Sequence, residues 1–254
     1  ESLVGLKNRT ELMQYMPNKK HHKWGIKLWV LCESATGYVY KLEVYTGKLY
    51  SSTRSAFGQA YDVVMRLLSG LFNKGYVLVV DNFYTSIPLA KSLYEKGTYI
   101  IGTLRRNRKF LPRQVLNIKL KQGEHVSFRS SEMLCSAFRK KKAKPVLLLS
   151  TRNIASQQEV RRRGKTIAVP ETVNSYNQNM GGCDLADQKI YTYEDDRRTY
   201  KWYMKIFHNL LYRTLLNAYI LYYKTLEKRK LERQSLPDFD EKAYTPISRQ
   251  QFLK

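Results

Sequence analysis

The sequence predicts an α/β fold in which helices flank a mixed β-sheet and a long helix follows towards the C-terminus. The apolar run Val77–Val80 is continuous rather than alternating, which is typical of a strand whose two faces are both covered. Apolar residues between Phe57 and Leu71 recur at helical spacing. A second set does so from Tyr203 to Leu221, which predicts the long helix.

The first elements follow from local patterns. Residues 24–31 and 38–45 predict two strands, joined by the turn Ser34-Ala35-Thr36-Gly37, and therefore a hairpin. The helix over 57–71 ends before Asn73-Lys74-Gly75, which supplies a stop signal.

The next elements complete the sheet. Residues 77–80 predict a central strand, and Ser86 and Pro88 open a short helix that ends at Gly97. Residues 98–104 form the next strand. Two antiparallel strands, a helix, a strand, a helix and a strand are in the order of an RNase H-like sheet, which is the fold we predict.

Three aspartates stand out against these elements. Asp81 is the first residue to leave the apolar strand, and a carboxylate fixed at a strand end is well placed to hold a metal ion, although a turn or helix cap is the alternative. Asp184 and Asp187 follow a glycine pair at a spacing that places both on one helix face. Together they make a carboxylate constellation.

The words around these acids resemble the piggyBac transposase family. Three of them are Asp81-Asn-Phe-Tyr-Thr-Ser, Gly102-Thr-Leu-Arg-Arg-Asn-Arg and Met180-Gly-Gly-Cys-Asp-Leu-Ala-Asp-Gln. Gln14-Tyr-Met-Pro-Asn-Lys-Lys and Glu43-Val-Tyr-Thr-Gly-Lys match as well, and the resemblance runs in the family's order from the first residue to about Lys224.

The resemblance implies a catalytic site of three aspartates on an RNase H-like core. Asp81 and Asp184 match the second and third, and Asp187 matches a further acid near the metal ions. The first family aspartate immediately precedes the glutamate that aligns with Glu1, so we expect it one position upstream of this chain. By itself, the chain is therefore expected to bind DNA without cutting it.

The implied chemistry is metal-dependent phosphoryl transfer. Two Mg²⁺ or Mn²⁺ ions, held by carboxylates, activate the attacking oxygen and stabilise the leaving oxygen. In the family these ions drive nicking of double-stranded DNA at transposon ends, hairpin formation and joining at TTAA targets, and the full-length proteins act as homodimers.

The resemblance also suggests a domain organisation. Residues 1–104 are expected to form the first part of the RNase H-like core, and 105–169, with short apolar pieces between charged stretches, resemble the family's β-rich insertion. Residues 170–234 complete the core with helices, and 235–254 form a polar tail.

Composition agrees with a DNA partner. The 254 residues include 45 Lys plus Arg against 21 Asp plus Glu, a formal net charge of +24, which DNA phosphates would neutralise. No apolar stretch approaches the roughly 20 residues that span a bilayer. The three cysteines show no paired spacing, which argues against a disulfide framework or a zinc site.

Particular side chains are candidates for contact with DNA. Three of them, Arg105, Arg106 and Arg108, follow the strand that neighbours Asp81. Contact with phosphate and simple exposure to solvent explain these three arginines equally well. The remaining candidates are Lys19, Lys20, Lys23, Lys201 and Trp202. Trp202 has basic neighbours and is the one aromatic residue of the long helix expected to stack on a base, whereas the stripe of that helix is expected to pack in the core.

Two basic runs, 139–144 and 161–165, fit nuclear localisation or nonspecific DNA contact equally, and we expect the protein in the nucleus. Two functions remain open at this point. The first is the catalytic domain of a transposase. The second is a domesticated piggyBac-derived protein that binds DNA or chromatin without catalysis.

Overall fold

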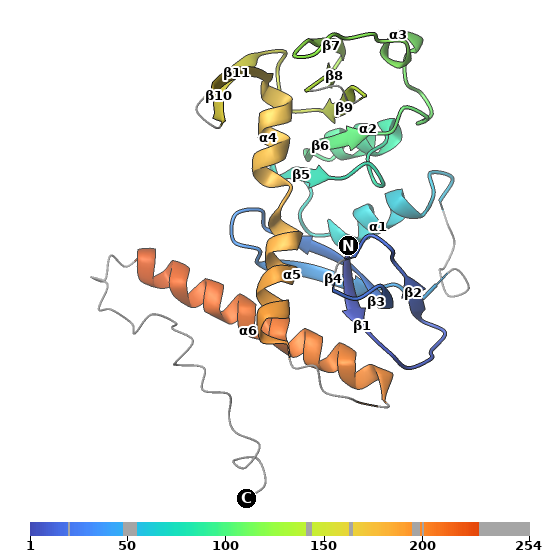
Figure 1. Cartoon of the computed structure of the whole chain (residues 1–254), viewed down its shortest axis with the longest axis vertical. Coiled ribbons are helices and arrows are strands. Elements are labelled where there is room, and N and C mark those ends of the chain that lie inside the picture. The colour runs from blue at the N-terminus through green and yellow to red at the C-terminus, as the bar shows by residue number, and fades with distance from the viewer. Residues whose placement is uncertain are drawn as a thin grey trace, which may run out of the picture.

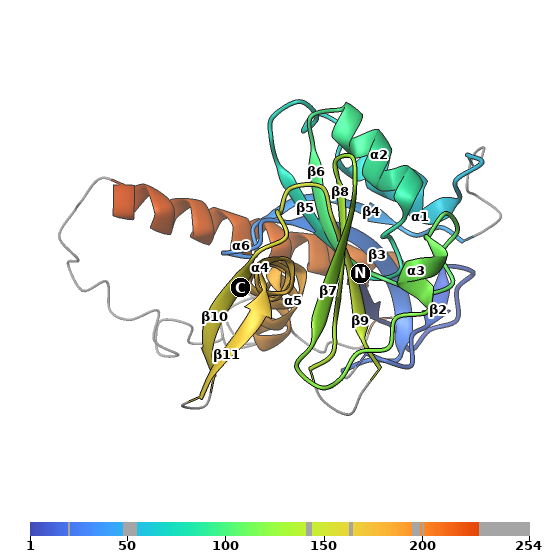
Figure 2. The same ribbon diagram turned by 90° about the horizontal axis from the view of Figure 1, so that it is seen from above.

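The computed structural model describes residues 1–19, 21–47, 55–140, 144–162, 165–194, 199 and 201–228. Within them lie two large sheets with helices packed against them, shown in Figure 1 and, from above, in Figure 2. This arrangement confirms the predicted α/β class. Lys20, the runs 141–143 and 163–164, and the predicted tail over 235–254 lie outside the described residues.

The first sheet has four strands: β1 (Ser2–Gly5), β2 (Met13–Tyr15), β3 (Trp24–Cys32) and β4 (Val39–Val44). β3 is central and antiparallel to the other three, with β1 along one edge and with β2 and β4 sharing the opposite edge. The predicted hairpin is thereby confirmed as β3 and β4. The pairing of β1 with β3 begins at Ser2 opposite Leu28, so β3 continues beyond the start of β1.

The second sheet has five strands in the spatial order β5 (Val77–Val80), β6 (Tyr99–Leu104), β9 (Val146–Ser150), β8 (Met133–Phe138) and β7 (His125–Ser130). β5 and β6 are parallel and the remaining pairs are antiparallel. The strands that the sequence assigns to an insertion therefore continue the sheet of β5 and β6.

Helices cover both faces of this second sheet. On one face, α1 (Gln59–Leu67), α2 (Ile87–Glu95) and α3 (Arg113–Leu116) surround the main core. On the other face, Tyr176 of α4 (Glu171–Asn179) packs on Ile101 and Leu148. Ser86 caps α2 through a hydrogen bond from the Leu89 amide, as its position before Pro88 predicts.

The predicted central position of the strand 77–80 is not found among the described strands. Among the described strands, β5 is the outermost member of its sheet and pairs only with β6. Its continuous apolar run has another cause, because Leu78 and Val80 pack on the main core while Val77 and Val79 pack on the opposite face. Burial of both faces, which the run does indicate, does not require a partner on both edges.

Helices α4 and α5 (Gly182–Tyr193) connect the two sheets, and α6 (Trp202–Lys228) packs on α5 and β1. Figure 1 shows α4 beside the second sheet and α5 continuing from it to the first, where α5 packs on β3 and on α6. The antiparallel strands β10 (Gln157–Arg162) and β11 (Lys165–Pro170) precede α4, so Arg161 and Arg162 of the basic run lie in β10 and Lys165 begins β11.

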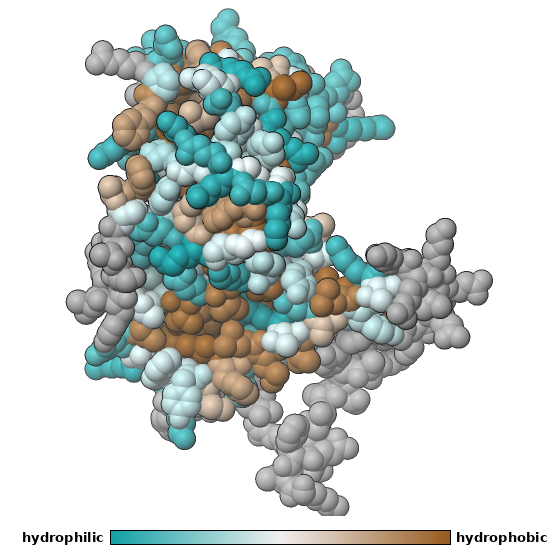
Figure 3. All heavy atoms as spheres, turned by 180° about the vertical axis from the view of Figure 1, so that it is seen from behind, coloured by the Kyte–Doolittle hydropathy of each residue, from teal (hydrophilic) through white to brown (hydrophobic). Residues whose placement is uncertain are grey.

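The prediction that the apolar stripe of α6, between Tyr203 and Leu221, packs in the core was wrong. Phe207 is 56% exposed, and Tyr203, Leu211 and Leu221 are exposed to a lesser extent. Figure 3 shows a hydrophobic band across the lower part of the molecule, the region that α6 crosses in Figure 1. The buried face of α6 holds Asn209 and Arg213 together with Ile220. Polar contacts explain this orientation: besides the Arg213 contacts described below, the Asn217 amide exchanges two hydrogen bonds with the backbone of Val39.

No helix in the described ranges combines the length and hydrophobicity that crossing a membrane requires.

Candidate active site

A cleft of about 1990 Å³ separates β5 from β3 and the start of α5. Six acidic residues line it: Glu1, Glu33, Asp81, Glu171, Asp184 and Asp187. All three aspartates that the sequence singles out thus line one cleft, Asp81 from the end of a strand and Asp184 and Asp187 from one helix.

Asp81 lies in a tight turn that follows β5. Its Oδ1 accepts a hydrogen bond from the Phe83 amide at 2.9 Å, and its carbonyl accepts bonds from the amide and the hydroxyl of Thr85. Thr85 is fully buried against Gly102 of β6, where an added Cβ would come within 2.2 Å of the threonine hydroxyl. Thr85 therefore fixes the turn to the neighbouring strand, while the Asp81 side chain remains exposed.

Two of the predicted DNA contacts hold this turn in place. Arg105 Nε donates to Asn82 Oδ1 at 2.9 Å, and Arg108 donates to the carbonyls of Asn82 and Phe83. Burial and the nearby Arg105 lower the pKa of Arg108. Arg106, between them, is exposed. The geometry therefore gives Arg105 and Arg108 a positioning role, and contact with DNA stays a prediction for all three.

Asp184 lies in the first turn of α5 with its side chain exposed to the cleft. The start of this helix is held close to the β3–β4 turn. A Cβ on Gly182 would lie 2.7 Å from the Glu33 carbonyl oxygen, and Gly37 approaches the backbone of Ala186 with φ +79°. Among the described residues, the Asp184 carboxylate has no hydrogen bond and no ion pair, so both of its oxygens are available to a ligand.

Two thiols adjoin Asp184, a feature that the spacing of the cysteines did not indicate. Cys183 donates a hydrogen bond to the Val30 carbonyl at 3.5 Å, and both Cys183 and Cys32 line the cleft. A hydrogen bond between the two thiols raises the pKa of Cys32 and lowers that of Cys183.

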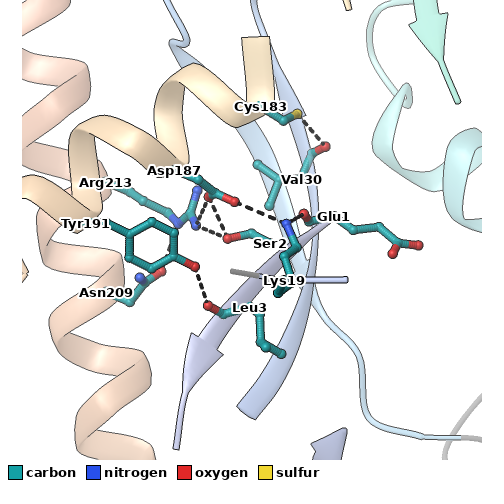
Figure 4. A network of polar contacts seen from close by, with 10 residues as sticks. All are labelled: Glu1, Ser2, Leu3, Lys19, Val30, Cys183, Asp187, Tyr191, Asn209 and Arg213. Atoms are coloured by element: carbon teal, nitrogen blue, oxygen red, sulfur yellow. Dashed lines mark hydrogen bonds and ion pairs between the residues drawn. The ribbon is translucent and has the colours of Figure 1, made fainter. Parts of the chain in front are cut away.

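Asp187 has a different environment. It is 7% exposed, and its Oδ1 accepts hydrogen bonds from Ser2 Oγ at 2.6 Å and from the Arg213 guanidinium at 3.1 Å. Lys19 Nζ lies 3.7 Å from its Oδ2. Figure 4 shows this network, which joins β1, α5 and α6 and also includes a bond from Arg213 to Asn209. The carboxylate is thus occupied by protein cations.

Glu1 is anchored at the same end of the cleft. Its carboxylate pairs with Lys27 at 3.0 Å and accepts a bond from the Tyr84 hydroxyl, while Lys19 donates to its carbonyl at 2.6 Å. Burial, together with the charges of Glu1 and Asp81, raises the pKa of Tyr84. The start of β1 is consequently fixed beside Asp81.

The donor set suits a hard divalent cation, because Asp81 and Asp184 present carboxylate oxygens that no described cation occupies. The first aspartate of the predicted three-aspartate site is expected upstream of Glu1, so that site stays a prediction. Within the described ranges, no three Asp, Glu, His or Cys side chains come together as a metal site. Asp187 is engaged with Arg213 and Ser2. As a ligand, Asp187 remains a prediction.

The sequence and the fold are both similar to those of known transposases. A family model described as Transposase IS4 matches residues 1–219. A cryo-EM structure of a piggyBac transposase synaptic complex with hairpin DNA superimposes with a TM-score of 0.79 at 28% identity, over 90% of this chain and 47% of that chain. The chain belongs to the piggyBac transposase family.

Human proteins of the piggyBac family are also similar to the chain. PiggyBac transposable element-derived protein 3 is 24% identical over 227 residues, covering 83% of this chain and 37% of that protein. PiggyBac transposable element-derived protein 2 is 23% identical over 216 residues, covering 78% and 36%. The chain thus spans less than half the length of these relatives.

Three of the other predicted DNA contacts of this piggyBac-family chain lie away from the cleft lining. Lys23 and Lys201 are exposed, and Trp202 begins α6 with 36% of its surface exposed. None of the three lines the cleft, whereas Lys19 does.

Ser2, Lys27 and Arg213 are the functional neighbours that the sequence analysis missed. For Arg213 a signal was available, because Asn209, Arg213 and Asn217 recur every four residues and so make one polar helix face. The long helix α6 therefore has two faces that could pack against the rest of the fold: this polar face and the aromatic stripe.

Proposed function

We propose that this chain is the catalytic core of a piggyBac-like DNA transposase that cleaves and transfers DNA strands with divalent metal ions. The observation that carries this proposal is the placement of Asp81 and Asp184 in one cleft, with carboxylates free of described protein cations. Fixed acids of this kind, on a strand end and a helix start, are what a metal-dependent phosphoryl transferase needs.

In this proposal Asp81 and Asp184 would hold Mg²⁺ or Mn²⁺. Bound ions of this type supply an activated oxygen nucleophile and stabilise the leaving oxygen. The protein's own part is positioning. Arg105, Arg108 and Thr85 fix the Asp81 turn, and the β3–β4 turn fixes the start of the helix that carries Asp184.

The RNase H-like sheet is part of the same proposal. β1 pairs with β3 only as far as Leu28, and both Val30–Cys32 of β3 and Val77–Val80 of β5 line the cleft. In a longer protein, a strand continuing β1 upstream of Glu1 would run antiparallel along this part of β3 and beside β5. It would join the two sheets, and its last residue would lie at the acidic end of the cleft.

Double-stranded DNA is the proposed substrate. A net charge of +24 favours a polyanion, and the similar piggyBac structure is a complex with hairpin DNA. Transposon ends, TTAA targets, a homodimer in the full-length protein and a nuclear location are proposed by family resemblance.

Metal binding tests the site directly. Mn²⁺ titration followed by electron paramagnetic resonance should show binding to the native chain and at least tenfold weaker binding to Asp81→Asn and Asp184→Asn. Glu95→Gln, which removes an exposed acid on α2, is the matched control and should bind as the native chain does. Equal Mn²⁺ affinity in all four proteins would overturn the assignment.

Cleavage tests the activity. The chain should bind but not nick an end-labelled duplex, whereas a protein extended upstream by a strand that ends in aspartate should nick it with Mg²⁺ or Mn²⁺. Asp184→Asn in the extended protein should abolish nicking and leave DNA binding intact. DNA binding with no nicking in the extended protein would instead favour the domesticated DNA-binding alternative.

A further inference from the structure

The segment between β6 and α3, residues 105–112, carries an aromatic side chain in an unusual position. Phe110 is 73% exposed, the highest value of any large hydrophobic side chain among the described residues. It lies in a basic stretch, and its neighbours Arg106 and Lys109 are also exposed. Packing in the core therefore does not account for a phenylalanine here.

The backbone of Phe110 makes this position more unusual. Its φ is +69°, in the left-handed region that favours glycine and is a genuine outlier for a bulky residue. The other described non-glycine residues with positive φ, Asn73 and Ser131, have small polar side chains. A bulky side chain in an unfavourable conformation, with little burial to offset it, indicates that the ring has a use outside the folded core.

The segment is tied to the candidate active site. Arg105 and Arg108 reach from it to Asn82 and Phe83, the two residues that follow Asp81. In Figure 1 it is the green connection between β6 and α3. Phe110 is thus carried by a segment whose position is set by the same hydrogen bonds that hold the Asp81 turn.

An exposed aromatic ring among cations matches one partner chemistry in particular. Proteins bind unpaired nucleotides by stacking bases on aromatic rings while basic side chains neutralise the adjacent phosphates. A base inside a duplex has both faces covered by its neighbours, so only an unpaired base offers a face to such a ring.

We propose that Phe110 stacks on an unpaired base of DNA held at the cleft, with Arg106 and Lys109 contacting the flanking phosphates. The segment 105–112 would then recognise a distorted or opened duplex, and it would place that distortion next to Asp81. This inference rests on the proposed function, since it assumes that DNA binds at the cleft.

The test compares two DNA probes that differ in one feature. The first is a fully paired duplex, and the second is the same duplex with one unpaired 2-aminopurine. Stacking on an aromatic ring should quench 2-aminopurine fluorescence. The native chain should quench this signal and bind the second probe about tenfold more tightly than the first, within the range measured for base–aromatic stacking.

Four variants distinguish the effect of the aromatic ring from the effect of the backbone conformation and from that of any exposed apolar side chain. Phe110→Ala and Phe110→Gly should both lose the quenching and the tenfold preference, although glycine also relieves the unfavourable φ. Phe110→Tyr should retain both. Phe57→Ala removes another highly exposed aromatic side chain, 57% exposed and outside the cleft lining, and should behave as the native chain.

The outcomes distinguish this inference from the proposed function. If Phe110→Ala keeps the native preference for the unpaired probe, or the native chain shows none while binding the duplex, the stacking role is overturned and the proposed function stands. If the native chain binds neither probe, the proposed function itself fails and the inference fails with it.

Discussion

Arg213 of α6 and Asp187 of α5 form a buried ion pair, with the guanidinium nitrogen 3.1 Å from the carboxylate oxygen. The pair also binds Ser2 of β1, so three segments that are far apart in the sequence meet at one carboxylate. One Arg213 nitrogen, Nη1, is buried without a hydrogen-bond partner in the described structure. This pair fixes α6 by its polar face and holds the start of β1 beside the cleft.

Replacing Arg213 with methionine should destabilise the protein by about 3–5 kcal/mol, because Asp187 would remain buried without its main cation. The measurement is the free energy of unfolding in urea. Arg66→Met is the matched control, since Arg66 and Glu43 form an exposed ion pair at 2.7 Å and its loss should cost about 1 kcal/mol or less. Equal costs for the two variants would contradict the role assigned to the buried pair.

Gly182→Ala should destabilise the protein by about 1–3 kcal/mol, because its Cβ would meet the backbone of Glu33 and Ser34 within 3 Å. Relief of this contact would displace the start of α5, so Mn²⁺ affinity at Asp184 should fall too. Gly181→Ala provides the comparison, since its added Cβ would have no neighbour within 4 Å. We expect its unfolding free energy to stay within about 0.5 kcal/mol of the native value; a similar loss in both variants would refute the close-packing argument.

Arg108→Ala should loosen the Asp81 turn without changing the number of phosphates contacted. Hydrogen exchange at the Phe83 and Thr85 amides should accelerate, because both amides donate within this turn. The slope of log affinity for duplex DNA against log salt should be unchanged, whereas the exposed Arg106, replaced by alanine, should lower it by about 1. A matching slope change in Arg108→Ala would show that its guanidinium contacts phosphate.

Phe207→Ala should change the free energy of unfolding by no more than about 0.5 kcal/mol, because its side chain is largely exposed. Ile220→Ala, on the buried face of the same helix, should cost about 2–5 kcal/mol. Urea unfolding of both variants decides which face of α6 packs on the fold. A cost for Phe207→Ala as large as that for Ile220→Ala would restore the core interpretation of the aromatic stripe.

The sequence alone determined the local elements and the family. The β3–β4 hairpin, α1, β5, α2, β6 and α6 all follow from patterns of a few residues, because apolar period, capping and turn residues act over short distances. Asp81, Asp184 and Asp187 could be recognised for the same reason, since each lies within a short motif that resembles the family.

Only the tertiary structure decided how these elements combine. Position within a sheet depends on distant partners, so the apolar run of β5 could not reveal an outer strand. The face of α6 that packs was likewise decided by Asp187 and Ser2, 26 and 211 residues away from Arg213. The same contacts occupy Asp187 and leave Asp81 and Asp184 open, because a carboxylate's neighbours in space, rather than in sequence, determine whether its charge is already balanced.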